Sequence, residues 1–157
     1  AHIGADSDSG AVHSVHVTAA NESDVANAHH LLHGDEKHVH ADAGFTGVEK
    51  RDEVKAAQQQ GRIKADVNWH VAERRHKIKV MPEGLTKELT QALERVKAQI
   101  RARVEHPFHI VKNLFGHKKL RYRGLVKNGA QLTVMFALAN LVLLKRPLLT
   151  LQGIGAP

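Results

Sequence analysis

Two carboxylates with unusual neighbours are the first residues of this sequence that could carry chemistry. Asp42 follows a short apolar run, residues 37–41, and precedes Gly44, so it is predicted to end a strand at the edge where α/β proteins place their clefts. Carboxylate oxygens held there suit a hard divalent cation such as Mg²⁺. The alternative, which position alone favours, is that Asp42 only caps the helix or turn that follows.

Glu105 is the second carboxylate, and it lies in a predicted helix between two cations. Arg101 is four residues before it and Lys112 is seven residues after it. Because each residue of a helix turns by about 100°, all three side chains are expected to project from nearly one face. Glu105 could therefore bind a metal ion while Arg101 and Lys112 hold phosphates. A salt bridge between Arg101 and Glu105 on an exposed helix is an equally good interpretation.

The distribution of charge divides the chain into two parts. Residues 1–94 carry 11 Lys/Arg and 15 Asp/Glu, whereas residues 95–157 carry 12 Lys/Arg and only one acidic residue, Glu105. Because neutralised phosphates release counterions and so drive binding, the basic part indicates a polyanion partner such as DNA. The alternative is a soluble pair of basic helices. The chain has no cysteine, which excludes disulfides, thiolate zinc sites and cysteine nucleophiles.

Hydrophobic periodicity and turn residues predict a mixed α/β order of elements. Strands come first and long helices last, which favours a layered α/β fold. The expected elements are a hairpin of strands over 2–5 and 11–18, strands over 37–41 and 66–72, helices over 24–33, 48–60, 85–115 with a kink at Pro107, and 130–145, and a charged connector over 73–79.

The last apolar stretch, residues 132–144, is interrupted by Thr133 and Asn140. It is shorter than the roughly 20 residues that a helix needs to span a bilayer, so we expect a buried amphipathic helix and no membrane partner. For a chain of 157 residues one domain is the default expectation. We expect this domain to cover residues 1–146 and a flexible tail to follow over 147–157.

Five short motifs in the same order resemble the DDE-type transposases of bacterial insertion sequences, in particular the insertion-sequence-five group. The motifs are Thr18-Ala19-Ala20-Asn21-x-x-Asp24, Ala41-Asp42-Ala43-Gly44-Phe45-x-Gly47, Arg101-x3-Glu105-x6-Lys112 with Val104-Glu105-His106-Pro107-Phe108, Arg121-Tyr122-Arg123-Gly124-Leu125, and Lys127-Asn128. The resemblance covers residues 1–146. It implies an α/β fold, namely an RNase H-like mixed sheet with flanking helices, here N-terminally truncated.

The resemblance also implies an Asp-Asp-Glu triad that binds two Mg²⁺ or Mn²⁺ ions for DNA cleavage and strand transfer. Asp42 would be its second carboxylate and Glu105 its third, both as catalytic residues and metal ligands. The first Asp is expected upstream of Ala1, with Asp6 and Asp8 as the only local substitutes, so the chain is expected to be inactive alone. The DNA-contacting side chains are expected to be Arg101, Arg103, Lys112, Lys118, Lys119, Arg121 and Arg123.

The implied partners are transposon ends and target DNA, bound in the bacterial cytoplasm at the nucleoid, with a homo-oligomer assembled on the DNA. One alternative is a basic DNA-binding remnant without catalytic activity. Another is a metal-binding protein that uses some of the 13 histidines. For that alternative, His29 and His33 are four residues apart on a predicted helix, a spacing that can bind Zn²⁺ or Ni²⁺.

Overall fold

The computed structural model describes residues 1–152. Contacts within the chain define two compact units. The first, called here the hairpin–helix unit, combines Ala1–Ala20 with Arg103–Pro157, and the second, the central unit, is Asn21–Ala102. The sequence suggested one domain over residues 1–146. In the structure, the hairpin–helix unit instead combines two segments that are far apart in the sequence.

The hairpin–helix unit begins with the predicted hairpin. Strand β1 (His2–Ala5) pairs antiparallel with β2 (Val12–His16). The Asp6 carboxylate holds the turn, because it accepts hydrogen bonds from the Ser9 backbone N–H at 2.6 Å and from the Ser9 hydroxyl at 2.7 Å. These bonds lower the pKa of Asp6. The small polar residues before Gly10 thus form a turn, as predicted.

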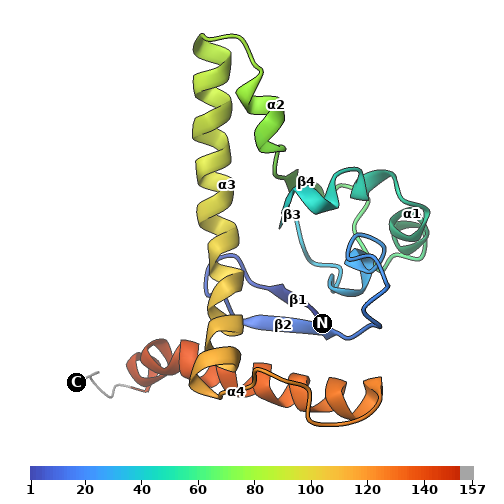
Figure 1. The fold of residues 1–157 in the computed structure, drawn as a ribbon, viewed down its shortest axis with the longest axis vertical. Coiled ribbons are helices and arrows are strands. Elements are labelled where there is room, and N and C mark those ends of the chain that lie inside the picture. The colour runs from blue at the N-terminus through green and yellow to red at the C-terminus, as the bar shows by residue number, and fades with distance from the viewer. Residues whose placement is uncertain (153–157) are drawn as a thin grey trace. The chain divides into compact units, whose positions relative to one another are not determined.

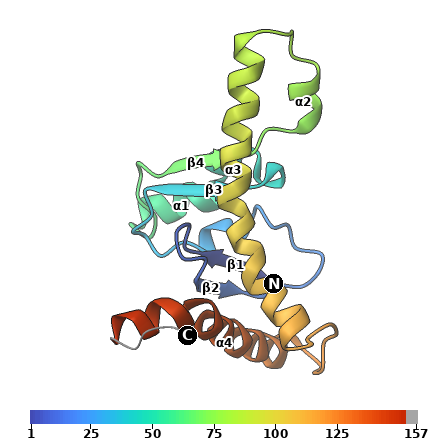
Figure 2. The same ribbon diagram turned by 90° about the vertical axis from the view of Figure 1, so that its left-hand side faces the viewer.

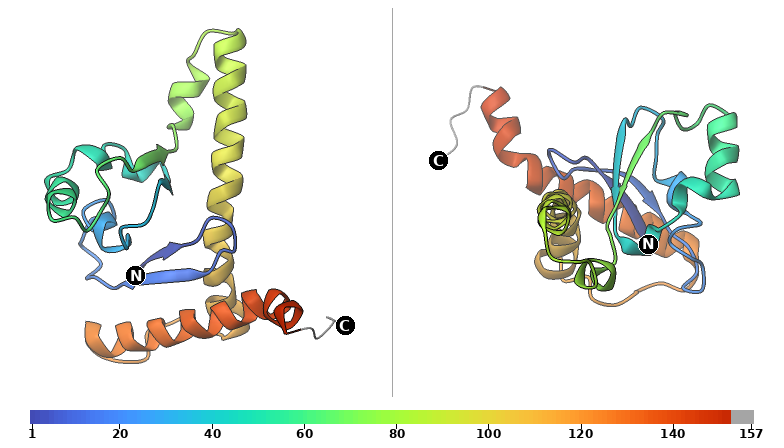
Figure 3. Two further views of the ribbon diagram at one scale, coloured as in Figure 1. Left: turned by 180° about the vertical axis from the view of Figure 1, so that it is seen from behind. Right: turned by 90° about the horizontal axis from the view of Figure 1, so that it is seen from above.

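The hairpin packs along helix α4 (Leu125–Leu151), as Figures 1 and 3 show. The core of this unit is apolar and aliphatic except for three phenylalanines, Phe108, Phe115 and Phe136. Phe136 is 1% exposed and meets the ring of Phe108 edge-on at 5.3 Å between centroids. The other core members are Ile110, Val111 and Ala139, with Ile3, Val12 and Val15 from the hairpin against them.

Helix α4 is longer and more exposed than predicted. It has 27 residues, and in the part that the structure describes it extends five residues into the segment expected to be a tail. By length and composition it could cross a membrane, a test that the core helix of a soluble protein also passes. The prediction of a helix too short to span a bilayer is wrong for the helix as formed. The prediction of burial is also wrong, because only 11% of its most apolar stretch is buried.

The central unit contains a parallel pair of strands, β3 (His38–Ala41) and β4 (Asn68–Val71). Helix α1 (Asp52–Gln59) lies between them in sequence, as the crossover of a parallel pair requires. Figure 2 shows α1 beside the two strands. Trp69 and Val71 on one side of the pair pack against a buried cluster that includes Val48 and Val54. Both strands were predicted.

The described residues contain two separate two-stranded sheets, one in each unit. This differs from the single mixed sheet that the resemblance implied. Strands β1 and β2 pair with each other through a tight turn, and β3 and β4 pair across α1. The observed architecture is therefore a mixed α/β chain with small sheets and several helices.

Local hydrogen bonding explains why the helix predicted over residues 24–33 does not form. Only the 3₁₀ turn η1 (Ala28–His30) is present there. The Asn27 amide donates to the Ser23 carbonyl at 3.0 Å, a bond that competes with helical backbone pairing. The helix predicted over 48–60 is also interrupted. It forms two pieces, the 3₁₀ turn η3 (Val48–Lys50) and α1.

The long helix predicted from Leu85 is present as α3 (Leu85–His109). It contains Pro107 and continues as a π-helical turn, η4 (Ile110–Leu114), that ends before Gly116 at a φ of 65°. Proline cannot donate the helical hydrogen bond, which is why the regular α-helical pattern changes near it. Before α3, the predicted charged connector forms the short helix α2 (Arg75–Lys79), so that expectation is wrong.

Candidate functional site

Asp42 stands directly after the carboxyl end of β3, as predicted. Its Oδ1 accepts the Gly44 N–H at 2.8 Å and so caps the 3₁₀ turn η2 (Ala43–Phe45). Asp42 is exposed. The two interpretations of this residue are therefore compatible, because one carboxylate oxygen caps the turn while the other faces solvent and could bind a cation.

Arg101 joins helix α3 to the residue before Asp42. Its guanidinium donates to the Ala41 carbonyl at 3.3 Å, within the central unit. No ion pair between Arg101 and Glu105 is present in the described residues, so the expected alternative of an i,i+4 salt bridge is not formed. Arg101 thus holds the end of β3 from the same helix that carries Glu105.

An ion pair that the sequence did not reveal fixes α3 to the end of β4. The Lys97 ammonium donates to the Val71 carbonyl at 3.0 Å and to Glu94 at 2.8 Å. Glu94 also accepts the Glu73 backbone N–H at 3.1 Å. Both charged side chains are nearly buried, at 13% and 14% exposure. In the sequence this pair looks like any surface pair three residues apart, and only the packing shows its role.

Three histidines gather on the face of the β3–β4 pair opposite Trp69. The Nδ1 of His38 and the Nε2 of His70 are 3.0 Å apart, and the rings of His40 and His70 stack at 4.7 Å between centroids. Burial lowers the pKa of His40, and the neighbouring His70, His38, Lys97 and Arg101 add to this. Burial also lowers the pKa of His70, with His38 and Lys97 contributing. The register that brings these rings together was not visible in the sequence.

Glu105 belongs to the hairpin–helix unit, whereas Asp42 and Arg101 belong to the central unit. The Glu105 side chain is exposed and makes no hydrogen bond or ion pair with a described residue. Its neighbour Arg103 is bonded to the hairpin turn, where it donates to the carbonyls of Ser7 and Asp8, the latter at 2.6 Å. The carboxylate of Glu105 therefore keeps its oxygen lone pairs available for a ligand.

The remaining predicted DNA contacts lie after α3. The Lys112 ammonium lies 5.7 Å from the centre of the Phe108 ring. Because Lys112 is in the π-helical turn η4, it does not follow the α-helical rotation that was expected to align it with Glu105. The exposed cations of the following connector, called here the basic connector, are Lys118, Lys119, Arg121 and Arg123.

Asn128 folds the basic connector back onto the start of α4. Its buried amide donates to the carbonyls of Tyr122 and Gly124, each at 2.7 Å, and accepts the Tyr122 N–H at 3.3 Å. These three bonds give the connector a defined conformation. The sequence pointed to the Lys127-Asn128 pair only through the resemblance. In the structure, Asn128 is the residue of this pair that holds the connector.

Replacing Asn128 by Ala should lower the free energy of unfolding by about 2 kcal/mol, because two carbonyls lose their buried donor. Urea unfolding followed by circular dichroism would measure the change. The matched control is Asn113→Ala, which removes one exposed bond to His109 and should cost little. Equal stability of the two variants would show that Asn128 does not organise the connector.

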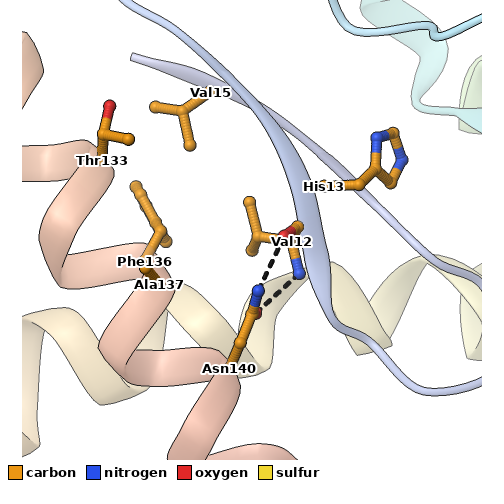
Figure 4. Close-up of a pocket in the computed structure, with 7 residues that line it drawn as sticks. All are labelled: Val12, His13, Val15, Thr133, Phe136, Ala137 and Asn140. Carbon is orange, nitrogen blue, oxygen red and sulfur yellow. Dashed lines mark hydrogen bonds between the residues drawn. The ribbon is translucent and has the colours of Figure 1, made fainter.

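A pocket between β2 and α4 is structural in character (Figure 4). The Asn140 amide donates to the Val12 carbonyl and accepts the Val12 N–H, both at 2.7 Å. Asn140 thus satisfies the backbone of β2 as a neighbouring strand would. Most of the lining is apolar, including Val15 and Phe136, and no carboxylate is among the lining residues.

The proposed pair of His29 and His33 does not share a helix, because only Ala28–His30 is helical there. His29 Nδ1 lies 2.9 Å from the Ala26 carbonyl oxygen, and the His33 backbone N–H donates to Glu36 at 2.8 Å. The i,i+4 geometry on which that metal site depended is therefore absent. The prediction that His29 and His33 share a helix face is wrong because the helix over 24–33 does not form.

These features define a basic α/β protein with exposed carboxylates, one at a strand end and one on a long helix. The family model for the transposase DDE domain matches residues 1–141. The chain therefore belongs to the transposase DDE domain family, as the motifs indicated. No solved structure matches it.

Proposed function

We propose that this chain acts in DNA transposition and that Asp42 and Glu105 bind divalent metal ions for cleavage and strand transfer. The observation that carries the proposal is the family match, which includes both carboxylates within residues 1–141. The RNase H-like fold, with β3 and α3 as the elements that carry the two carboxylates, is part of the same proposal.

Asp42 and Glu105 offer ligands that suit a hard divalent cation such as Mg²⁺ or Mn²⁺. Asp42 and Glu105 are exposed, and neither is neutralised by an ion pair within the described residues. Carboxylate oxygens are the ligands that these cations prefer. When bound, the ions would supply Lewis acidity toward the phosphodiester and lower the pKa of the attacking water.

The chain's own cations would hold the DNA. The basic connector presents four exposed cations on a segment that Asn128 keeps ordered, which suits contacts to successive phosphates. Lys112 adds a further cation next to the connector. Arg101 and Arg103 bind backbone carbonyls, so we assign them positioning roles beside any contact with phosphate. We place the protein with DNA in the cytoplasm, at the nucleoid, and as a homo-oligomer on its substrate.

A second candidate function is DNA binding without cleavage. It is favoured by the contacts of Asp6 and Asp8, the two carboxylates that could replace the first Asp of the triad. Asp6 accepts three hydrogen bonds within its own turn, and Asp8 lies 3.7 Å from the Arg103 guanidinium. Neither is arranged as a metal ligand, which leaves two assigned carboxylates in this chain.

Metal removal distinguishes the two functions. For the cleaving enzyme, a labelled DNA duplex should be nicked in Mg²⁺ or Mn²⁺, and EDTA should abolish the nicking. Binding should weaken linearly with the logarithm of salt concentration, with a slope of about −0.9 for each phosphate neutralised. Salt-sensitive binding with no nicking in either metal would establish the second function, and binding that is independent of salt would contradict both.

A further inference from the structure

The two faces of the β3–β4 pair differ sharply in chemistry. Alternate residues of a strand point to opposite faces, so His38 and His40 share one face of β3 while Val39 points to the other. The parallel register places His70 beside His40. One face is therefore apolar and packed, and the other carries three imidazoles from two strands.

The spacing of two ring nitrogens on this face matches that of metal ligands. His38 Nδ1 and His70 Nε2 are 3.0 Å apart. Two imidazoles on one metal ion at about 2.0–2.1 Å from it place their nitrogens roughly 3 Å apart when they are adjacent ligands. We propose that His38 and His70, with His40 as the third ligand, form a binding site for Zn²⁺ or a similar nitrogen-preferring transition-metal ion.

His40 supports this assignment through an unsatisfied atom. Its Nδ1 is buried and has no hydrogen-bond partner in the described part of the chain. Buried polar atoms without partners are rare, since each costs free energy. The His40 ring stacks on the His70 ring, and the His40 side chain would have to turn for all three rings to reach one ion.

The protonation of the site is compatible with metal binding. Burial lowers the pKa of His70, so this ring is neutral near pH 7 and has a lone pair to give. The proton that now lies between His38 and His70 can move to the outer nitrogen of its own ring by a change of tautomer. The nearby ammonium of Lys97 is already bonded to Glu94 and to the Val71 carbonyl, which limits its repulsion of a cation.

This site is chemically distinct from the carboxylate site of the proposed function. Imidazole nitrogens select Zn²⁺, Ni²⁺ and Cu²⁺, whereas Mg²⁺ prefers oxygen ligands and octahedral geometry. A metal ion bound here would bridge β3 and β4 and so stabilise the strand pair that ends at Asp42. The inference does not depend on DNA cleavage.

The test is titration of the whole chain with Zn²⁺ alone, without DNA, by calorimetry and thermal unfolding. The wild-type chain should bind one ion at this site and gain thermal stability. His38→Gln and His70→Gln should each lower the affinity by about 10-fold or more. The matched control is the double variant His76→Gln/His106→Gln, which alters two exposed histidines outside the strand pair and should keep the wild-type affinity.

Circular dichroism of the variants and competition with Mg²⁺ complete the experiment. His38 is exposed, so His38→Gln should retain the circular dichroism spectrum of the wild-type chain, and any loss of affinity then reflects a lost ligand. Millimolar Mg²⁺ should not displace Zn²⁺. Zn²⁺ affinity that is unchanged in both single variants, or is lost only in the control, would overturn the proposal and leave the His38–His70 contact a structural hydrogen bond.

Discussion

Glu105→Gln should lower the affinity for Mn²⁺ by about 100-fold, since even the loss of an outer partner of a metal ligand costs about 10- to 100-fold, and any metal-dependent cleavage of DNA should fall with it. The substitution keeps the size of the side chain and removes only its charge. Within the residues that the structure describes, Glu105 has no ion pair or hydrogen bond to lose, so the stability of the hairpin–helix unit should not change. Nicking of labelled duplex DNA in Mn²⁺ and direct Mn²⁺ binding would both measure the effect.

The control for this experiment is Glu88→Gln, which neutralises another exposed glutamate of α3. It should cleave and bind Mn²⁺ as the wild-type chain does. Asp42→Asn should behave like Glu105→Gln if both carboxylates hold the same ions. If Glu105→Gln cleaves at the wild-type rate, Glu105 is not a metal ligand and the proposed function loses its third carboxylate.

Phe136→Ala should lower the free energy of unfolding of the hairpin–helix unit by about 3–5 kcal/mol. Phe136 is almost completely buried and touches Phe108, so truncation leaves a cavity at the centre of the core. Small domains are stable by only about 5–15 kcal/mol in total, so this unit would be close to unfolding. Urea unfolding with a probe in β2 or α4 would show the loss.

Val134→Ala on the same helix provides the comparison, because Val134 is 59% exposed and its truncation should change stability by less than about 0.5 kcal/mol. The transition of the central unit should be unaffected by either variant. A Phe136→Ala variant as stable as Val134→Ala would mean that α4 does not depend on this core.

Local sequence signals predicted the elements whose causes are local. Strand β2 follows an alternating β-branched run, β1 follows a short apolar run, and α3 follows an apolar repeat that begins at Leu85. The failures have non-local or competing causes. The helix over 24–33 was lost to side-chain bonds such as that of Asn27. The helix expected over 130–145 forms as Leu125–Leu151 and includes Gly129 and Pro147, two residue types that disfavour a helix interior.

In the candidate site, too, residues marked by local sequence could be predicted and contacts between distant residues could not. Asp42, Glu105 and the basic connector could be proposed because each is marked by its neighbours in sequence and by family motifs. The bond of Arg101 to Ala41 and the pair of Glu94 and Lys97 depend on how α3 meets the strand ends, which no spacing reveals. The imidazole face likewise depends on the register of His40 with His70.

The composition of the hairpin–helix unit from the two ends of the chain has a consequence for biosynthesis. Residues 1–20 are made before the central unit, whereas the helix that covers them is made after it. A lone two-stranded hairpin is only marginally stable, so Ile3, Val12 and Val15 stay uncovered while the continuous central unit can already fold. The nascent chain therefore offers chaperones an apolar hairpin while the central unit is being made. Translation that stops near residue 102 would yield a folded central unit with an uncovered hairpin, a product suited to rapid proteolysis.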